Sequence, residues 1–154
     1  MKNVLLSLML PALITAAPLL GADDEKPKRT PSPKGARSYI VLPRDGRTVN
    51  PKFKVVFGIQ GMGVCPAGIT AADGQPIPDT GHHHLLVDVD NLPPLDVPLP
   101  ADQHEKIMHF GKGQTEVMLE LPSGQHTLQL IFADHAHVAH DPPVISEKIT
   151  ITVR

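Results

Sequence analysis

The sequence predicts an all-β protein, folded as an antiparallel β-sandwich. Three observations lead to this class: short runs in which apolar and polar residues alternate, a lack of helical periodicity, and 17 prolines in 154 residues. Turn-forming residues separate the runs, as is typical of a sandwich built from short strands. The chain has four Phe, one Tyr and no Trp, so its core must consist mainly of Val, Ile and Leu.

Residues 1–22 have the pattern of a secretory signal peptide. A lysine near the start supplies positive charge, residues 4–20 are almost wholly apolar, and Ala22 precedes an acidic stretch. The alternative, a membrane-spanning anchor, is disfavoured by Pro11 and Pro18 within the apolar run. We therefore expect cleavage near Ala22, with Ala17 as the alternative, and a periplasmic or secreted protein. No second apolar run of this length follows, so we expect no stable membrane insertion after cleavage.

Residues 23–37 and 38–154 differ in composition. The first segment, DDEKPKRTPSPKGAR, combines charges and prolines without apolar periodicity, which predicts a flexible linker. The second has the length of one domain, and we assign the β-sandwich to it. The net charge of −2 offers no basic surface, so we expect no nucleic-acid partner.

Six segments of this domain have the pattern of strands. In residues 115–121, for example, one valine and two leucines alternate with glutamates and a methionine, as on a half-buried strand. The turn residues 122–124 separate this run from the next. The six predicted strands are residues 38–42, 53–59, 84–89, 115–121, 126–132 and 149–153.

Two stretches resemble parts of immunoglobulin-like domains. SYIVLPRDGRTVNPKFKVVF, residues 38–57, resembles the first two strands of bacterial immunoglobulin-like domains, and LELPSGQHTLQLIFAD, residues 119–134, resembles their strands E and F. The resemblance implies an immunoglobulin-like antiparallel β-sandwich of about seven strands. The disulfide and the buried tryptophan of antibody domains are absent, so the resemblance is one of architecture.

Four longer motifs follow one another in the domain: FGIQGMGVCPAG, GHHHLLVDVD, HFGKGQTEVMLELPSGQHTLQL and DPPVISEKITITV. Taken in this order, they resemble an uncharacterised bacterial secreted family, domain of unknown function 4399 (DUF4399). The resemblance covers about residues 38–154. It implies an exported sandwich-like domain and no established activity.

Eight of the nine histidines are expected at or near one end of the sandwich. In an immunoglobulin-like sandwich the B–C, D–E and F–G connections lie at the same end. These connections and the strand ends beside them hold the histidines of residues 81–84, 104–109 and 135–140. Only His126, after the E–F turn, belongs at the opposite end.

A metal site at this end is the first functional hypothesis. Alternate residues of a strand share a face, so His82 and His84 should point the same way, and His135 and His137 repeat the spacing if the chain is extended there. Imidazole suits copper and zinc, and thiolate or thioether favours Cu(I). The predicted function is therefore that of an exported protein that binds, stores or delivers copper or zinc. The predicted ligands are His82, His84, His109, His135, His137, His140, Met108 and Cys65.

The second hypothesis is a cell-envelope interaction module that binds no metal. Its histidines would bond one another and loop carbonyls, and its partner would be an envelope protein. Cys65 is the single cysteine, so it forms no internal disulfide, and burial as a small residue is its alternative to a ligand role. We predict no enzyme, because no Gly-x-Ser-x-Gly motif is present and nothing in the sequence orders the thiol as a nucleophile.

Overall fold

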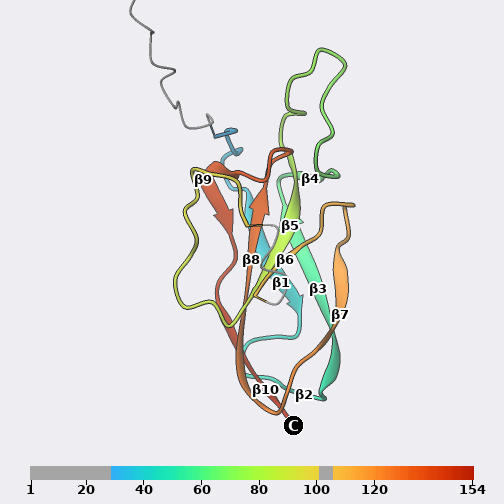
Figure 1. Ribbon diagram of the computed structural model, residues 1–154, viewed down its shortest axis with the longest axis vertical. Helices are drawn as coiled ribbons and strands as arrows, with labels where there is room; N and C mark the ends of the chain where they lie inside the picture. Colours follow the sequence, from blue (N-terminus) through green and yellow to red (C-terminus); the bar gives the residue numbers. More distant parts are fainter. Residues whose placement is uncertain (1–28, 101–105) are drawn as a thin grey trace, which may run out of the picture.

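The computed structural model describes residues 29–100 and 106–154, which form ten strands and no helix (Figure 1). The predicted all-β sandwich is confirmed. The predicted signal peptide, residues 1–22, lies outside the described residues, as do residues 23–28 of the predicted linker and His104. Because the described part of the chain contains no helix at all, none could cross a membrane.

The ten strands include all six predicted segments, now β1, β3, β5, β7, β8 and β10, and four others. Three of the added strands are only two or three residues long, and the fourth contains two prolines, so none has a strong strand pattern in the sequence. The bounds are β1 Arg37–Leu42, β2 Thr48–Val49, β3 Lys52–Gln60, β4 Gly63–Val64, β5 Thr80–Val87, β6 Ile107–His109, β7 Glu116–Glu120, β8 Gly124–Ala133, β9 Ala139–Ile145 and β10 Ile149–Val153.

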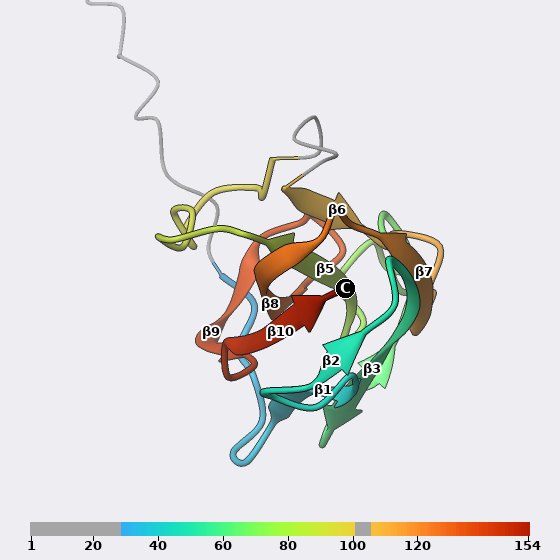
Figure 2. The ribbon, with the colours of Figure 1, turned by 90° about the horizontal axis from the view of Figure 1, so that it is seen from below.

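Two sheets form the sandwich. One has the order β1-β3-β7, and the other has the order β2-β10-β8-β5-β4, with β6 paired to β5 and β9 paired to β8. Seen from below in Figure 2, the two sheets curve around a shared interior. The predicted antiparallel order has two exceptions, since the two-residue strands β2 and β4 pair in parallel with β10 and β5.

Strand β5 begins four residues earlier than the sequence pattern indicated. We predicted residues 84–89, but the strand is Thr80–Val87 and pairs with β4, β6 and β8. Asp88 has a positive φ of 52°, which ends the strand. The three histidines therefore lie inside a central strand and not at its start. Their position inside the strand decides how deeply they are buried.

Both faces of β5 are covered. Its inner face contributes Leu85 and Val87 to the main core between the sheets. Its outer face contributes Leu86 to a second apolar cluster, in which the segment after β5 packs Leu95 and Leu99 over the sheet. A strand buried on both faces has no solvated side for polar residues, so any histidine on it is removed from water.

Candidate metal centre

Strand β5 carries three consecutive histidines, and all three side chains are fully buried. Because side chains alternate along a strand, His82 and His84 share the outer face with Leu86, and His83 points to the inner face with Leu85. The ring centroids of His82 and His84 are 4.8 Å apart. The His-x-His pair read from the sequence thus forms one side of a site.

The neighbouring strand β6 adds His109 to this face. The register places His109 directly opposite His84, with their ring centroids 5.1 Å apart and the rings nearly parallel. One ligand nitrogen from each of His82, His84 and His109 lies within 4.8 Å of the other two. Sheet register alone therefore gathers three imidazoles (β5 and β6 lie side by side in Figure 1).

The loop between β8 and β9 brings in His137. This residue has a positive φ of 67°, and the Nε2 atom of His137 lies 3.2 Å from the Nε2 atom of His109. Its ring centroid is 5.0 Å from that of His82. Two imidazoles on one tetrahedral zinc ion, at the usual bond length, have nitrogens about 3.3 Å apart. We call His82, His84, His109 and His137 the four-histidine cluster.

The surroundings keep three rings of the four-histidine cluster, those of His82, His84 and His109, uncharged at neutral pH. Burial, with smaller contributions from neighbouring histidines, lowers the pKa of His82 to about 3 and that of His84 to about 2. The pKa of His109 is also lowered, by burial and then by His137. A neutral imidazole has a lone pair free for a metal, so a divalent cation could bind at pH 7 without displacing protons from these three rings.

The two buried members of the cluster have unsatisfied polar atoms. Neither ring nitrogen of His82, and neither of His84, has a hydrogen-bond partner among residues 29–100 and 106–154. Each buried polar group left unpaired costs about 1–3 kcal/mol. A bound cation would use one nitrogen of each ring and offset part of that cost.

The inner face of the seven-stranded sheet holds a separate row of rings. The ring of His140 stacks on Phe132, and His83 contacts Phe132 edge-on and also packs against Phe57. The two ring nitrogens of His140 lie 3.2 Å from the Phe132 carbonyl and 3.1 Å from the Thr80 carbonyl. His140, a predicted ligand, therefore lies outside the four-histidine cluster and is held by backbone carbonyls.

Three other predicted ligands also lie apart from the cluster. Met108 packs on the main core, on the opposite side of β6 from His109. Cys65 is half-buried, its amide donates to the Gly81 carbonyl over 2.7 Å, and no thiol belongs to the gathered ligand atoms of the described residues. His135 is half-buried, and because its loop turns, it does not repeat the side-by-side geometry of the pair on β5.

His126, predicted to lie at the other end, has an ordinary structural role. The Nδ1 atom of His126 lies 2.7 Å from a carboxylate oxygen of Asp88, and its Nε2 atom lies 2.9 Å from the Pro122 carbonyl. The hydrogen bond to Asp88 raises the pKa of His126 above its usual value. This pair contrasts with His82 and His84, which have no such acceptors in the described structure.

A comparison with protein families assigns the chain to a family. The family model described as "Domain of unknown function (DUF4399)" matches residues 55–154. The chain belongs to the DUF4399 family. The resemblance seen in the sequence is confirmed over this range, which includes β5, β6 and the loop that carries His137. No curated protein matches the chain, and no solved structure does.

One residue that shapes the site in this DUF4399 domain was missed by sequence reasoning. Asp134, which precedes the His135-Ala136-His137 stretch, is only 3% exposed, and its carboxylate accepts hydrogen bonds from the amides of Ala136 and Val138. A signal was present, because aspartate often bonds the amide two residues ahead in a turn. The second His-x-His pair was expected only if the chain is extended at His135 and His137, and the turn at Asp134 does not give that geometry.

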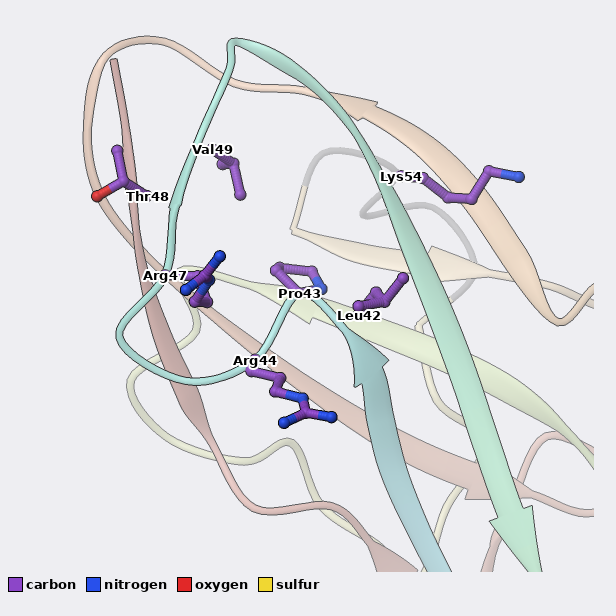
Figure 3. Close-up of a pocket in the computed structure, with 7 residues that line it drawn as sticks. All are labelled: Leu42, Pro43, Arg44, Arg47, Thr48, Val49 and Lys54. Carbon is purple, nitrogen blue, oxygen red and sulfur yellow. The ribbon is translucent and has the colours of Figure 1, made fainter.

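A hollow of about 470 Å³ lies at the opposite end of this DUF4399 domain from the cluster. Figure 3 shows its lining between β1, β2 and β3, with Arg44, Arg47 and Lys54 around Pro43. None of the histidines lines it. Lys54 is paired with Glu116 over 2.7 Å, so part of its positive charge is already balanced.

Proposed function

We propose that this DUF4399 domain is an exported protein that binds one copper or zinc ion through the four-histidine cluster, to hold or deliver the metal. One observation supports this above the others. Two fully buried imidazoles, whose nitrogens have no hydrogen-bond partner in the described structure, lie beside two half-buried imidazoles. Histidine is the commonest metal ligand in proteins, and a ligand role would account for the unpaired nitrogens.

The donor set favours Zn(II) or Cu(II) over Cu(I). All four ligands of the proposed site are imidazoles, which suit both divalent ions. The sulfur of Met108 is directed to the other side of β6, and Cys65 is not among the gathered ligand atoms of the described residues. A softer site for Cu(I) would require those sulfurs. Export to the periplasm or the medium rests on the sequence of residues 1–22.

The competing proposal, a structural histidine cluster in an envelope interaction module, is less well supported. His140 and His126 show what a structural histidine looks like in this fold, since both of their ring nitrogens lie within reach of oxygen acceptors. The ring nitrogens of His82 and His84 have no hydrogen-bond partner among the described residues. A purely structural role would leave the cost of burying those nitrogens uncompensated.

Calorimetric titration of tag-free protein with Zn(II), Cu(II) and Cu(I) tests the proposal. We expect one Zn(II) or one Cu(II) per chain with a dissociation constant below about 10 μM, which corresponds to about −7 kcal/mol. Weaker binding of all three ions would remove the metal function and leave the interaction module as the remaining candidate.

A further inference from the structure

The loop that presents His137 is organised by a single buried carboxylate. One oxygen of Asp134 accepts hydrogen bonds from the amides of Ala136 and Val138, at 2.9 and 3.0 Å. The His137 amide donates to the Asp134 carbonyl over 3.0 Å, and the His137 carbonyl accepts from the Leu99 amide over 2.9 Å. The position of the His137 ring therefore depends on the placement of Asp134.

The second oxygen of Asp134 is bound by the N-terminal segment of the described chain. The Thr30 hydroxyl donates to this oxygen over 2.6 Å. The carboxylate also lies close enough to His82 to favour positive charge there, which a bound cation would supply.

Residues 29–32, which we call the N-terminal strap, lie along β9. The Asp141 amide donates to the Thr30 carbonyl over 2.9 Å, and the Ser32 amide donates to the Asp141 carbonyl over 3.0 Å. The Arg29 side chain donates to the carbonyls of Ala139 and His140. The strap falls within the segment predicted to be a flexible linker, yet here it is bonded along its whole length.

We propose that Thr30 and Asp134 form the outer support of the metal site, so that docking of the N-terminal strap and binding of the metal stabilise each other. This inference rests on the proposed metal-binding function. Outer partners that orient a ligand typically change metal affinity 10- to 100-fold when they are removed. The coupling is reciprocal, so the metal must favour the docked strap by the same factor. Thr30 is thus a positioning residue for His137.

The experiment compares three variants of the full chain. Thr30→Val keeps the shape of the side chain and removes the hydroxyl, and Thr30→Ser keeps the hydroxyl. Ser32→Ala is the matched control, because it removes a strap hydroxyl that bonds only the exposed Pro142 carbonyl. Zn(II) affinity is measured by calorimetry, and nitrogen ligation by the electron paramagnetic resonance spectrum of the Cu(II) form. Amide exchange at Ser32 and Asp141 is measured with and without Zn(II).

We expect Thr30→Val to weaken Zn(II) binding 10- to 100-fold. The electron paramagnetic resonance spectrum of its Cu(II) form should show one fewer coordinated imidazole nitrogen. Thr30→Ser and Ser32→Ala should stay within about threefold of the wild type. Zn(II) should slow exchange at Ser32 and Asp141 in the wild type and not in Thr30→Val. If the wild type binds Zn(II) and Thr30→Val binds it equally well, the strap inference alone is wrong. If the wild type binds neither Zn(II) nor Cu(II), the proposed function and the inference both fail.

Discussion

The Nε2 atoms of His109 and His137 lie 3.2 Å apart, although the residues are 28 positions apart in the chain. His109 comes from a three-residue strand and His137 from a loop, so only the folded sandwich brings these nitrogens together. At this separation the two atoms can share one proton or bind one metal ion, but they cannot both carry protons without strong repulsion.

Substituting Gly111 should weaken metal binding without changing a ligand. The Gly111 backbone lies directly against the His109 ring, and an added Cβ would overlap the Cε1 and Nε2 atoms of that ring. Gly111→Ala should therefore displace His109 and weaken Zn(II) binding at least tenfold, as measured by calorimetry.

Gly63→Ala is the control for this substitution, because its Cβ would meet the nearest atom, in the Thr80 side chain, at an ordinary 3.6 Å. We expect its Zn(II) affinity to equal that of the wild type. Equal affinity in Gly111→Ala would mean that the position of His109 does not matter for binding.

The metal-free protein should lose stability as the pH falls below about 6.5. Burial holds the pKa of His82 at about 3, that of His83 at about 4 and that of His84 at about 2. In the unfolded chain all three return to about 6.5, so below that pH the unfolded state binds more protons and folding stability drops. For each group, the free energy of unfolding falls by at most about 1.4 kcal/mol per pH unit, until the pH reaches the pKa of that group in the folded protein.

Urea unfolding of chelator-treated protein at pH 7, 6 and 5 measures this effect. Three such groups should reduce the free energy of unfolding by about 6 kcal/mol between pH 7 and pH 5. Stability that stays constant over this range would show that the three rings are not buried in the neutral form.

His83 tests whether the unpaired nitrogens on the inner face are destabilising. Both of its ring nitrogens are buried without a hydrogen-bond partner in the described residues, between Phe57 and Phe132. His83→Leu, a substitution of similar volume, should raise the free energy of unfolding by about 1 kcal/mol at pH 7. A loss of more than 1 kcal/mol in denaturant unfolding would contradict this, because it would reveal a stabilising partner of the ring.

The pair of His126 and Asp88 should have the opposite pH dependence. The hydrogen bond to Asp88 raises the pKa of His126, so its contribution is fully present below about pH 6.5 and is lost as the pH rises through the raised folded value. Asp88→Asn keeps the shape of the side chain and removes the charge, and asparagine tolerates the positive φ at this position. The free energy of unfolding of the variant should be lower than that of the wild type by about 1 kcal/mol at pH 5.5 and by almost nothing at pH 9. An equal loss at both values would show that the charge on His126 is not involved.

Alternation along strands made part of the fold and of the site predictable. Period-two patterns located the main strands, and the same rule placed His82 and His84 on one face. That rule could not place His137, because its loop turns on the buried carboxylate of Asp134 and does not continue as a strand. It also could not separate His109 from Met108 as ligands, since which face of β6 meets the cluster depends on the register with β5.

The burial of the histidines was also beyond the sequence pattern. Three adjacent histidines look like a polar strand end, but β5 extends to Thr80 because β4 and β8 both pair with it. The segment that packs Leu95 and Leu99 over the outer face is rich in proline and has no strand pattern. These long-range contacts turn a polar stretch into a buried donor set.

The most direct test of the four-histidine site compares two variants of the same strand. The double variant His82→Ala/His84→Ala removes both outer-face imidazoles, and His83→Leu removes the inner-face imidazole between them. In calorimetric titrations with Zn(II) and Cu(II), the double variant should show no binding at 100 μM protein, while His83→Leu should match the wild type. Metal should also raise the free energy of unfolding of the wild type and of His83→Leu, by about 2.7 kcal/mol when the free metal concentration is a hundred times the dissociation constant. Metal binding that survives in the double variant, or that is lost in His83→Leu, would contradict a site on the outer face of β5.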